Sequence, residues 1–260
     1  MKPDLKDSIT FSLDGSNPEL YPHFAYLLQD LWELGSSGRV LIDLLQRNNV
    51  KDNLNEFSIL DLGCGKGAVS IPVIREFGGK LLGIDAMPEF IETARHLSDQ
   101  FGISGSCTFK TADIREEIRK LSGFNLILLS SIGPVLGNAG ETLKKISGCL
   151  SSQGYVFLDD GYIPEGSDVI LENVQSEKEF TEQIGKSGFE TIDKYVYTQT
   201  EMSSSNEKIY TAISRRADEL VIQYPEKKNL FEKYLKEQRL ENDILENKIT
   251  CAGFLLKKTN

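Results

Sequence analysis

The chain has 260 residues, of which 40% are hydrophobic and 26% charged, and its formal net charge at pH 7 is −10. This composition indicates a globular domain with additions, and the acidic balance argues against a nucleic-acid substrate because phosphate backbones are repelled. The sequence lacks an apolar run of membrane-spanning length, and its four dispersed cysteines and two histidines indicate neither disulfides nor a metal centre, so we expect a cytoplasmic protein without a membrane partner.

The N-terminal region is expected to be helical. Residues 1–16 suggest a short leader with little core. A helix then begins at Asn17-Pro18, because Asn is a good N-cap and proline fits the first helical position. After a break at 35–38, a second helix covers about 40–48. This N-terminal helical cap, residues 1–52, covers either the mouth of a site or only an edge of the sheet.

Strands and helices alternate through the middle of the chain. Continuous or alternating apolar runs bounded by turn residues predict seven strands, the last of them close to the C-terminus. The expected strands are 57–62, 81–85, 106–110, 124–129, 155–158, 189–197 and 249–256. This alternation predicts an α/β fold with a doubly wound, mostly parallel sheet, in which residues 53–200 form the core. Such sheets bind ligands at the carboxyl ends of their strands.

A charged helical stretch precedes the last strand. Apolar residues with helical spacing run from about Asn206 to Asn247 and are interrupted at Tyr224-Pro225. We therefore expect a helical insertion over residues 201–247, placed as a lid, and residues 248–260 as the last strand of the core sheet.

The first strand leads into an acid and three alternating glycines. Asp61, Gly63, Gly65 and Gly67 precede a helix, and this pattern predicts a tight turn whose bare backbone can approach a nucleoside-type cofactor. A P-loop is excluded, because no Ser or Thr follows the lysine. A dinucleotide fingerprint fits poorly, since the third glycine is replaced by Ala68 and an acid is unfavourable beside a pyrophosphate.

The stretch Asp61-Leu62-Gly63-Cys64-Gly65-Lys66-Gly67 resembles motif I of the class I S-adenosylmethionine-dependent methyltransferases. Asp61 suits this cofactor because S-adenosylmethionine carries an ammonium and a sulfonium, which attract a carboxylate. The resemblance implies S-adenosylmethionine as the cofactor and a seven-stranded sheet whose last strand is antiparallel.

Other strand ends agree with the resemblance. It implies that Asp85 accepts the ribose hydroxyls, that Asp113 accepts from the adenine amine and that Ile114 packs on the adenine ring. Capping of the following helices explains either aspartate nearly as well. The implied cofactor-binding residues are Asp61, Gly63, Cys64, Gly65, Gly67, Asp85, Ala86, Asp113, Ile114 and Ser130.

The acceptor side is less defined. Asp159, followed by Asp160 at the end of the fifth strand, is our catalytic candidate because it could hold an amine or accept a proton; a solvated strand end is the alternative. Candidate substrate-binding residues come from the helical additions and the strand ends. They are Tyr21, Trp32, Ser131, Tyr162, Tyr210 and Arg215. The aromatic residues suit core positions better than a substrate cage, and Arg215 suits an exposed ion pair better than a substrate carboxylate.

The sequence thus predicts a methyltransferase with a helical lid that acts on a small-molecule acceptor by in-line transfer. The chain lacks a [DNS]-P-P-[YFW] motif, which argues against methylation of DNA amino groups. Three alternatives stay open: a non-catalytic S-adenosylmethionine-binding sensor or partner subunit, an NAD-linked oxidoreductase, and a methyltransferase that acts on a protein.

Overall fold

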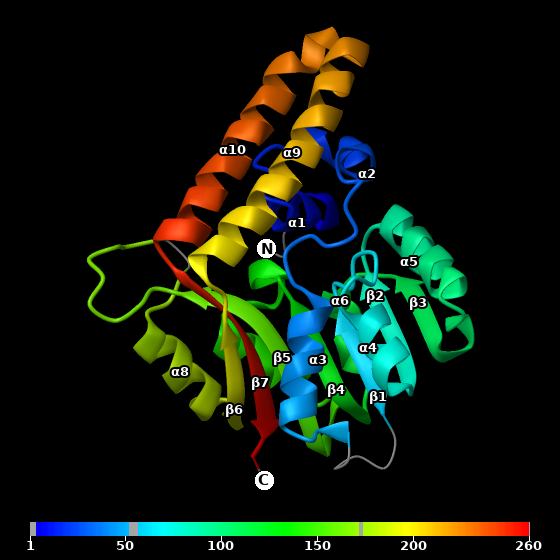
Figure 1. Ribbon diagram of the computed structural model, residues 1–260, viewed down its shortest axis with the longest axis vertical. Helices are drawn as coiled ribbons and strands as arrows, with labels where there is room; N and C mark the ends of the chain where they lie inside the picture. Colours follow the sequence, from blue (N-terminus) through cyan, green and yellow to red (C-terminus); the bar gives the residue numbers. More distant parts are fainter. Residues whose placement is uncertain (1–3, 52–56, 172–173, 260) are drawn as a thin grey trace.

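The computed structural model describes residues 4–51, 57–171 and 174–259. Its centre is a seven-stranded sheet in the order β3-β2-β1-β4-β5-β7-β6 (Figure 1). Six strands are parallel, and β7 runs antiparallel to both of its neighbours. The strands are β1 (Ser58–Leu62), β2 (Lys80–Asp85), β3 (Cys107–Thr111), β4 (Phe124–Ser130), β5 (Leu150–Tyr162), β6 (Phe189–Val196) and β7 (Thr250–Lys258). The expected fold class and antiparallel last strand are confirmed, whereas the expected boundary at 52/53 lies outside the described residues.

Helices cover both faces of the sheet, as a buried parallel sheet requires. In β4, residues 126–129 are fully buried on both faces. One face packs against α3, α4 and α5, and the other against α6, α7 and α8. These helices are α3 (Gly38–Arg47), α4 (Ser70–Phe77), α5 (Pro88–Gln100), α6 (Ile114–Glu117), α7 (Ala139–Ile146) and α8 (Glu177–Lys186).

The carboxyl ends of the parallel strands meet along one edge of the sheet. Asp85 pairs with Thr111 in β3, and Ser130 pairs with Asp159 in β5. Because paired residues in parallel strands lie side by side, this register gathers the acidic strand ends that the sequence contains. A site for a ligand therefore lies at this edge.

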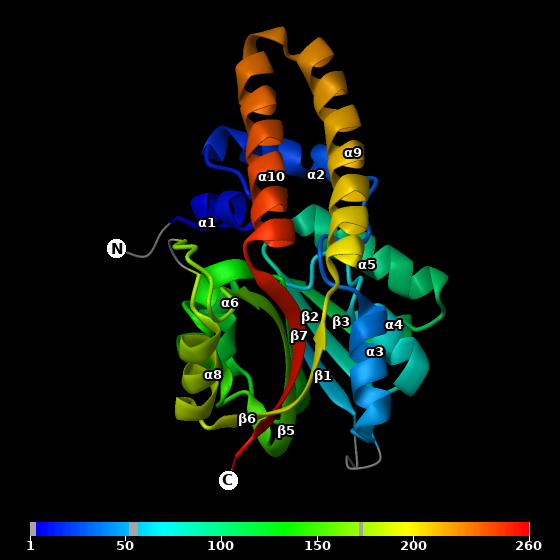
Figure 2. The same ribbon diagram turned by 60° about the vertical axis from the view of Figure 1, so that its left-hand side comes forward.

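A helical hairpin rises from the same edge. It consists of α9 (Gln199–Gln223), the short η6 (Pro225–Lys227) and α10 (Lys228–Asn247), and the two long helices run side by side in both views (Figures 1 and 2). The turn falls at Tyr224-Pro225, as expected. However, α9 begins seven residues before the expected Asn206, because Thr198 and Glu201 form a capping box.

The N-terminal segment packs against this hairpin and forms a third apolar cluster with it. It contains α1 (Leu5–Ser12), η1 (Pro18–His23) and α2 (Phe24–Leu27). The expected leader is instead a helix, capped by Asp4, in which Ile9 is buried. Burying such a side chain contributes about 1.5–3 kcal/mol. The helix expected after Asn17 is divided, because Pro22 lacks the N–H that a regular helix needs.

Candidate active site

The glycine loop after β1 has the backbone that its sequence predicts. Gly63 and Gly65 have φ values of 71° and 51°, which favour glycine. A Cβ at Gly63 would lie 2.6 Å from Ile132, whereas a Cβ at Gly65 would meet no described atom within 4 Å. The loop therefore packs tightly against the protein at Gly63, whereas at Gly65 it leaves space for a ligand.

Asp61 lies buried beneath this loop. Only 1% of the residue is exposed, and its Oδ1 atom has no hydrogen-bond partner among the described residues. Burial raises the pKa of Asp61 to about 7, and the nearby Asp85 adds to that rise while Ser70 opposes it. The Ser130 Oγ atom is also buried and has no hydrogen-bond partner among the described residues. Unsatisfied buried acceptors are costly, so both atoms suit a ligand with N–H or O–H donors.

The carboxylates at the ends of β2 and β3 are held by the chain itself. Asp85 accepts the backbone N–H groups of Gly65 at 2.9 Å and Met87 at 2.8 Å. Asp113 caps α6 by accepting the Arg115 N–H at 2.9 Å, and it also pairs with the Arg115 guanidinium at 2.8 Å. The capping alternative thus holds for Asp113, yet both side chains also line the cavity described next.

A cavity of about 160 Å³ lies over the glycine loop, and we call it the glycine-loop cavity. Nine of the ten expected cofactor-binding residues line it: Asp61, Gly63, Cys64, Gly65, Asp85, Ala86, Asp113, Ile114 and Ser130. Gly67 does not; its φ of 74° shapes the turn, and a Cβ there would lie 2.7 Å from Ile71. From the other side α1 narrows the cavity with Ser8, Ile9 and Ser12.

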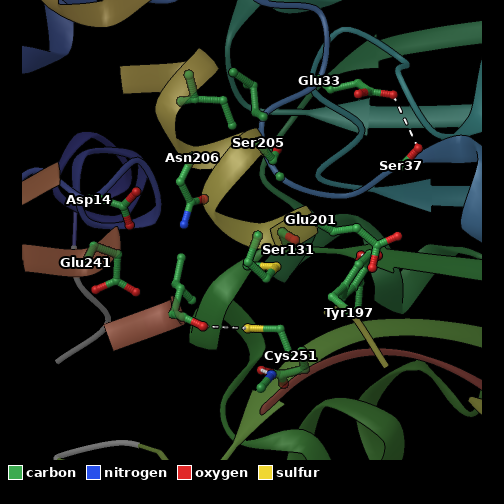
Figure 3. Close-up of a pocket in the computed structure, with 18 of the residues that line it drawn as sticks. Asp14, Glu33, Ser37, Ser131, Tyr197, Glu201, Ser205, Asn206, Glu241 and Cys251 are labelled. Carbon is green, nitrogen blue, oxygen red and sulfur yellow. Dashed lines mark hydrogen bonds between the residues drawn. The ribbon is translucent and has the colours of Figure 1, made fainter. Parts of the chain in front are cut away.

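A second cavity of about 1,880 Å³, the hairpin cavity, lies between the α9–α10 hairpin, α3 and the carboxyl edge of the sheet. In Figure 3, Ser131 and Tyr197 lie on the sheet side, while Asp14 and Glu241 face each other from the N-terminal segment and α10. The two cavities share Ser12, Trp32, Leu34 and Ser131 in their walls. The two cavities therefore adjoin at these four residues.

Comparison with known proteins agrees with this arrangement. The sequence model of a family described as "Methyltransferase domain" matches residues 54–248, which is most of the chain. The chain belongs to the S-adenosylmethionine-dependent methyltransferases. This family membership confirms the resemblance based on motif I, and it excludes the alternative of an NAD-linked oxidoreductase.

Solved structures of low sequence identity share the methyltransferase fold. A methyltransferase from Geobacter sulfurreducens, in complex with S-adenosyl-L-homocysteine, superimposes with a TM-score of 0.71 at 14% identity, covering 90% of this chain and 97% of that one. The corresponding complex from Thiobacillus denitrificans gives 0.70 at 16%, covering 91% and 98%. A cyclopropane synthase from Mycobacterium tuberculosis gives 0.63 at 13%, covering 83% and 84%.

Asp159 lines the hairpin cavity of the methyltransferase and is only 8% exposed. Its Oδ2 accepts the Tyr197 hydroxyl at 2.7 Å, and the Ser36 hydroxyl lies close enough to lower the pKa of the carboxyl group. Burial raises the pKa of Asp159, against the opposing effect of these two hydroxyls. Ser36 Oγ lies 2.8 Å from Ser131 Oγ. The solvated strand end that we kept as an alternative does not describe this buried, bonded carboxylate.

The six expected substrate-binding residues divide into two groups. Trp32 and Ser131 line both cavities. Ser131 also has a φ of 55°, a backbone strain that is typical of functional sites.

The other four residues line neither cavity. Tyr162 is buried against Phe180 and Phe254, and Tyr210 stacks under Arg239 between the hairpin helices. Arg215 pairs with Asp30, and Tyr21 packs in the third apolar cluster. The core and ion-pair alternatives therefore describe these four better than substrate binding does.

The sequence analysis did not predict several residues of the site. Ser36 lies in a segment that looks like a helix break, and nothing in its neighbourhood signals a buried hydroxyl. The helix α1 did carry a signal, because Leu5, Ile9 and Leu13 recur every four residues after the Asp4 cap.

The sequence analysis also did not predict the role of Lys66. This buried lysine donates to the carbonyls of Leu28 at 2.5 Å and Leu31 at 2.6 Å, and thereby ties the glycine loop to the N-terminal segment.

Proposed function

We propose that this methyltransferase transfers the methyl group of S-adenosylmethionine to a small molecule bound in the hairpin cavity. The observation that carries the proposal is the shared wall, since Trp32, Leu34 and Ser131 border both cavities. Methyl transfer requires the acceptor to lie in line behind the methyl group, and two adjoining cavities permit that alignment. A pocket filled by side chains would instead have favoured a non-catalytic binding protein.

The residues of the glycine-loop cavity fit the cofactor. The unsatisfied Asp61 carboxylate suits the ammonium of S-adenosylmethionine, which neutralises a buried charge. Asp85 and Asp113 lie at adjacent strand ends, where we assign them the ribose hydroxyls and the adenine amine. The cofactor supplies an electrophilic methyl group. Because the glycine-loop cavity is smaller than the roughly 300–1,000 Å³ of common ligand sites, α1 moves outward when the cofactor enters.

The α9–α10 hairpin serves as a lid in this proposal. It roofs the hairpin cavity and is attached to the N-terminal segment through the third apolar cluster and the Arg216–Asp30 pair. Such a lid would exclude water from the transfer. The same helices offer an exposed surface that a protein substrate would use, so the test must separate the two substrate classes.

Four free cysteines support our expectation of a reducing, cytoplasmic setting. Within the described ranges, no helix is both long enough and apolar enough to cross a membrane.

Calorimetry with S-adenosyl-L-homocysteine tests the cofactor site. We expect binding that Asp85→Ala weakens about tenfold or more, because a charge-assisted contact is lost. Glu92→Ala, an exposed acid on the neighbouring α5, is the matched control and should bind like the wild type. Equal affinity in all three proteins would contradict the site assignment.

Labelled S-adenosylmethionine tests the substrate class. The enzyme is incubated with cell extract that has been divided into protein and low-mass fractions. We expect the labelled methyl group in the low-mass fraction. Label confined to the protein fraction would support the protein-substrate alternative instead.

A further inference from the structure

Asp159 lies next to the wall of the glycine-loop cavity. It pairs in register with Ser130, and residues paired in neighbouring parallel strands are about 4.8 Å apart and point to the same face. Ser130 lines the glycine-loop cavity, whereas Asp159 lines the hairpin cavity. An acceptor that approaches the cofactor through the hairpin cavity therefore passes the Asp159 carboxylate.

Three hydroxyls lie around this carboxylate. Tyr197 donates to it at 2.7 Å, Ser36 lies close enough to lower its pKa, and Ser131 bonds to Ser36 at 2.8 Å. Ser131 lies where the two cavities meet. Since burial raises the pKa of Asp159, its carboxylate takes up a proton more readily than an exposed aspartate does.

The hairpin cavity carries an excess of negative charge. Nine carboxyl side chains and two basic side chains, Arg39 and Lys208, line it among the described residues. Three of the nine carboxylates, those of Asp30, Asp43 and Glu237, pair with basic residues outside the cavity, which leaves an acidic excess. Asp160 follows Asp159 on β5, and Glu241 lies beside Asp14 on one side of the cavity (Figure 3). Such a field attracts a cationic ligand and repels a carboxylate.

We propose that the acceptor is an amine that arrives as an ammonium ion, and that Asp159 is the catalytic residue that removes its proton. This inference rests on the proposed methyltransferase function and names the substrate class for that site. Tyr197 is a positioning residue, because it acts through Asp159.

The proton has to leave before the methyl group can be transferred, because an ammonium has no free lone pair. The Asp159 carboxylate takes one proton from nitrogen and becomes neutral. The freed lone pair forms the N–C bond while the C–S bond breaks and its electron pair stays on sulfur. The positive charge thus moves from sulfur to the methylated ammonium, and Asp159 returns its proton to solvent through the hairpin cavity.

Ligand binding tests the proposal without turnover. Protein saturated with S-adenosyl-L-homocysteine is titrated with butylamine, benzylamine, phenethylamine and spermidine, and with the alcohol and the carboxylate matching each of the first three. We expect at least one amine to bind about tenfold or more tightly than the corresponding uncharged and anionic compounds. Asp159→Asn should weaken binding of the preferred amine about tenfold.

Asp160→Asn is the matched control, since it removes the same charge one residue away and should weaken amine binding less than Asp159→Asn. The proposal is overturned if no amine binds better than its alcohol, or if the two variants lose equal affinity. Binding of S-adenosyl-L-homocysteine by Asp159→Asn shows that the variant is folded. If the wild type itself does not bind this compound, the proposed function fails rather than the inference.

Tyr197→Phe separates a positioning role from a structural one. Charged and titratable groups around Asp159 are Asp160 on the same strand, Cys251 on β7 and Tyr197 after β6. Removing the Tyr197 donor raises the pKa of Asp159, so the midpoint of amine binding against pH should shift upward. A lower melting temperature with an unchanged midpoint would refute the positioning role.

Discussion

The Lys66 ammonium lies 2.5 Å from the Leu28 carbonyl, so the glycine loop and the N-terminal segment are joined by a buried hydrogen bond. The connection is reinforced by Trp32, whose indole N–H donates to the Lys66 carbonyl at 3.1 Å. Burial lowers the pKa of Lys66 to about 8, although the nearby Asp30 opposes the change. The glycine loop and the N-terminal segment thus form one unit at this point.

Lys66→Met should lower the stability of the protein. The variant leaves the Leu28 and Leu31 carbonyls without their donor, and we expect a loss of about 1–3 kcal/mol in the free energy of unfolding. Lys80→Met is the control, since Lys80 also donates to a carbonyl, that of Gly105, but at the surface. Urea denaturation measures the difference; equal stability losses would contradict the structural role of Lys66.

Gly63→Ala and Gly65→Ala should separate stability from binding. At Gly63 the new Cβ meets Ile132 at 2.6 Å with φ at 71°, and we expect a destabilisation of about 1–3 kcal/mol. At Gly65 the new Cβ has room within the described protein and would meet the cofactor instead. Scanning calorimetry should therefore show the larger loss for Gly63→Ala. Titration with S-adenosyl-L-homocysteine should show a large loss of affinity for Gly65→Ala, although its loss of stability is small.

The affinity for S-adenosyl-L-homocysteine should rise with pH up to about 7–8. Burial raises the pKa of Asp61 to about 7, whereas the ligand's ammonium requires the charged carboxylate, so binding at lower pH releases a proton. Calorimetry at pH 6 in two buffers of different ionisation enthalpy measures that proton. Asp61→Asn should abolish the release, and an unchanged release would assign it to another group.

Asp61 also affects the stability of the ligand-free protein. A carboxyl whose folded pKa exceeds its unfolded value binds more protons when folded, so its contribution to stability decreases as the pH rises from about 4 to about 7. Asp61→Asn should flatten this part of the stability profile in thermal melts. A steeper profile in the variant would contradict the raised pKa.

Arg216→Ala should loosen the hairpin. Arg216 binds both oxygens of Asp30, through Nε at 2.5 Å and Nη2 at 2.7 Å, and thereby joins α9 to the turn after α2. We expect faster amide exchange in α9 and in residues 24–34, with a small change in melting temperature because the pair is partly exposed. Arg239→Ala removes an ion pair with Glu207 inside the hairpin and serves as the control. Unchanged exchange in Arg216→Ala would show that this pair does not hold the lid.

Much of the lining of the glycine-loop cavity was predictable because its residues lie at the ends of consecutive strands. Asp61, Asp85 and Asp113 each end a strand or follow one, and a parallel sheet brings such positions to one edge. Local pattern therefore sufficed to predict that nine of the ten expected residues lie around one cavity. It failed for Tyr162, which packs against Phe180, and for Tyr210, which lies under the Arg239 guanidinium, because neither side chain lines the cavity.

By itself the sequence determined the order of strands and helices, the glycine turn and the family, since these depend on residue periodicity and on contacts between near neighbours. Only the tertiary structure brought Ser36, Ser131, Asp159 and Tyr197 together, because they come from the cap, two strand ends and the segment after β6. Their meeting depends on how the hairpin and the N-terminal segment pack over the sheet. Hydrogen bonds between residues so far apart in the chain leave no periodic pattern in the sequence.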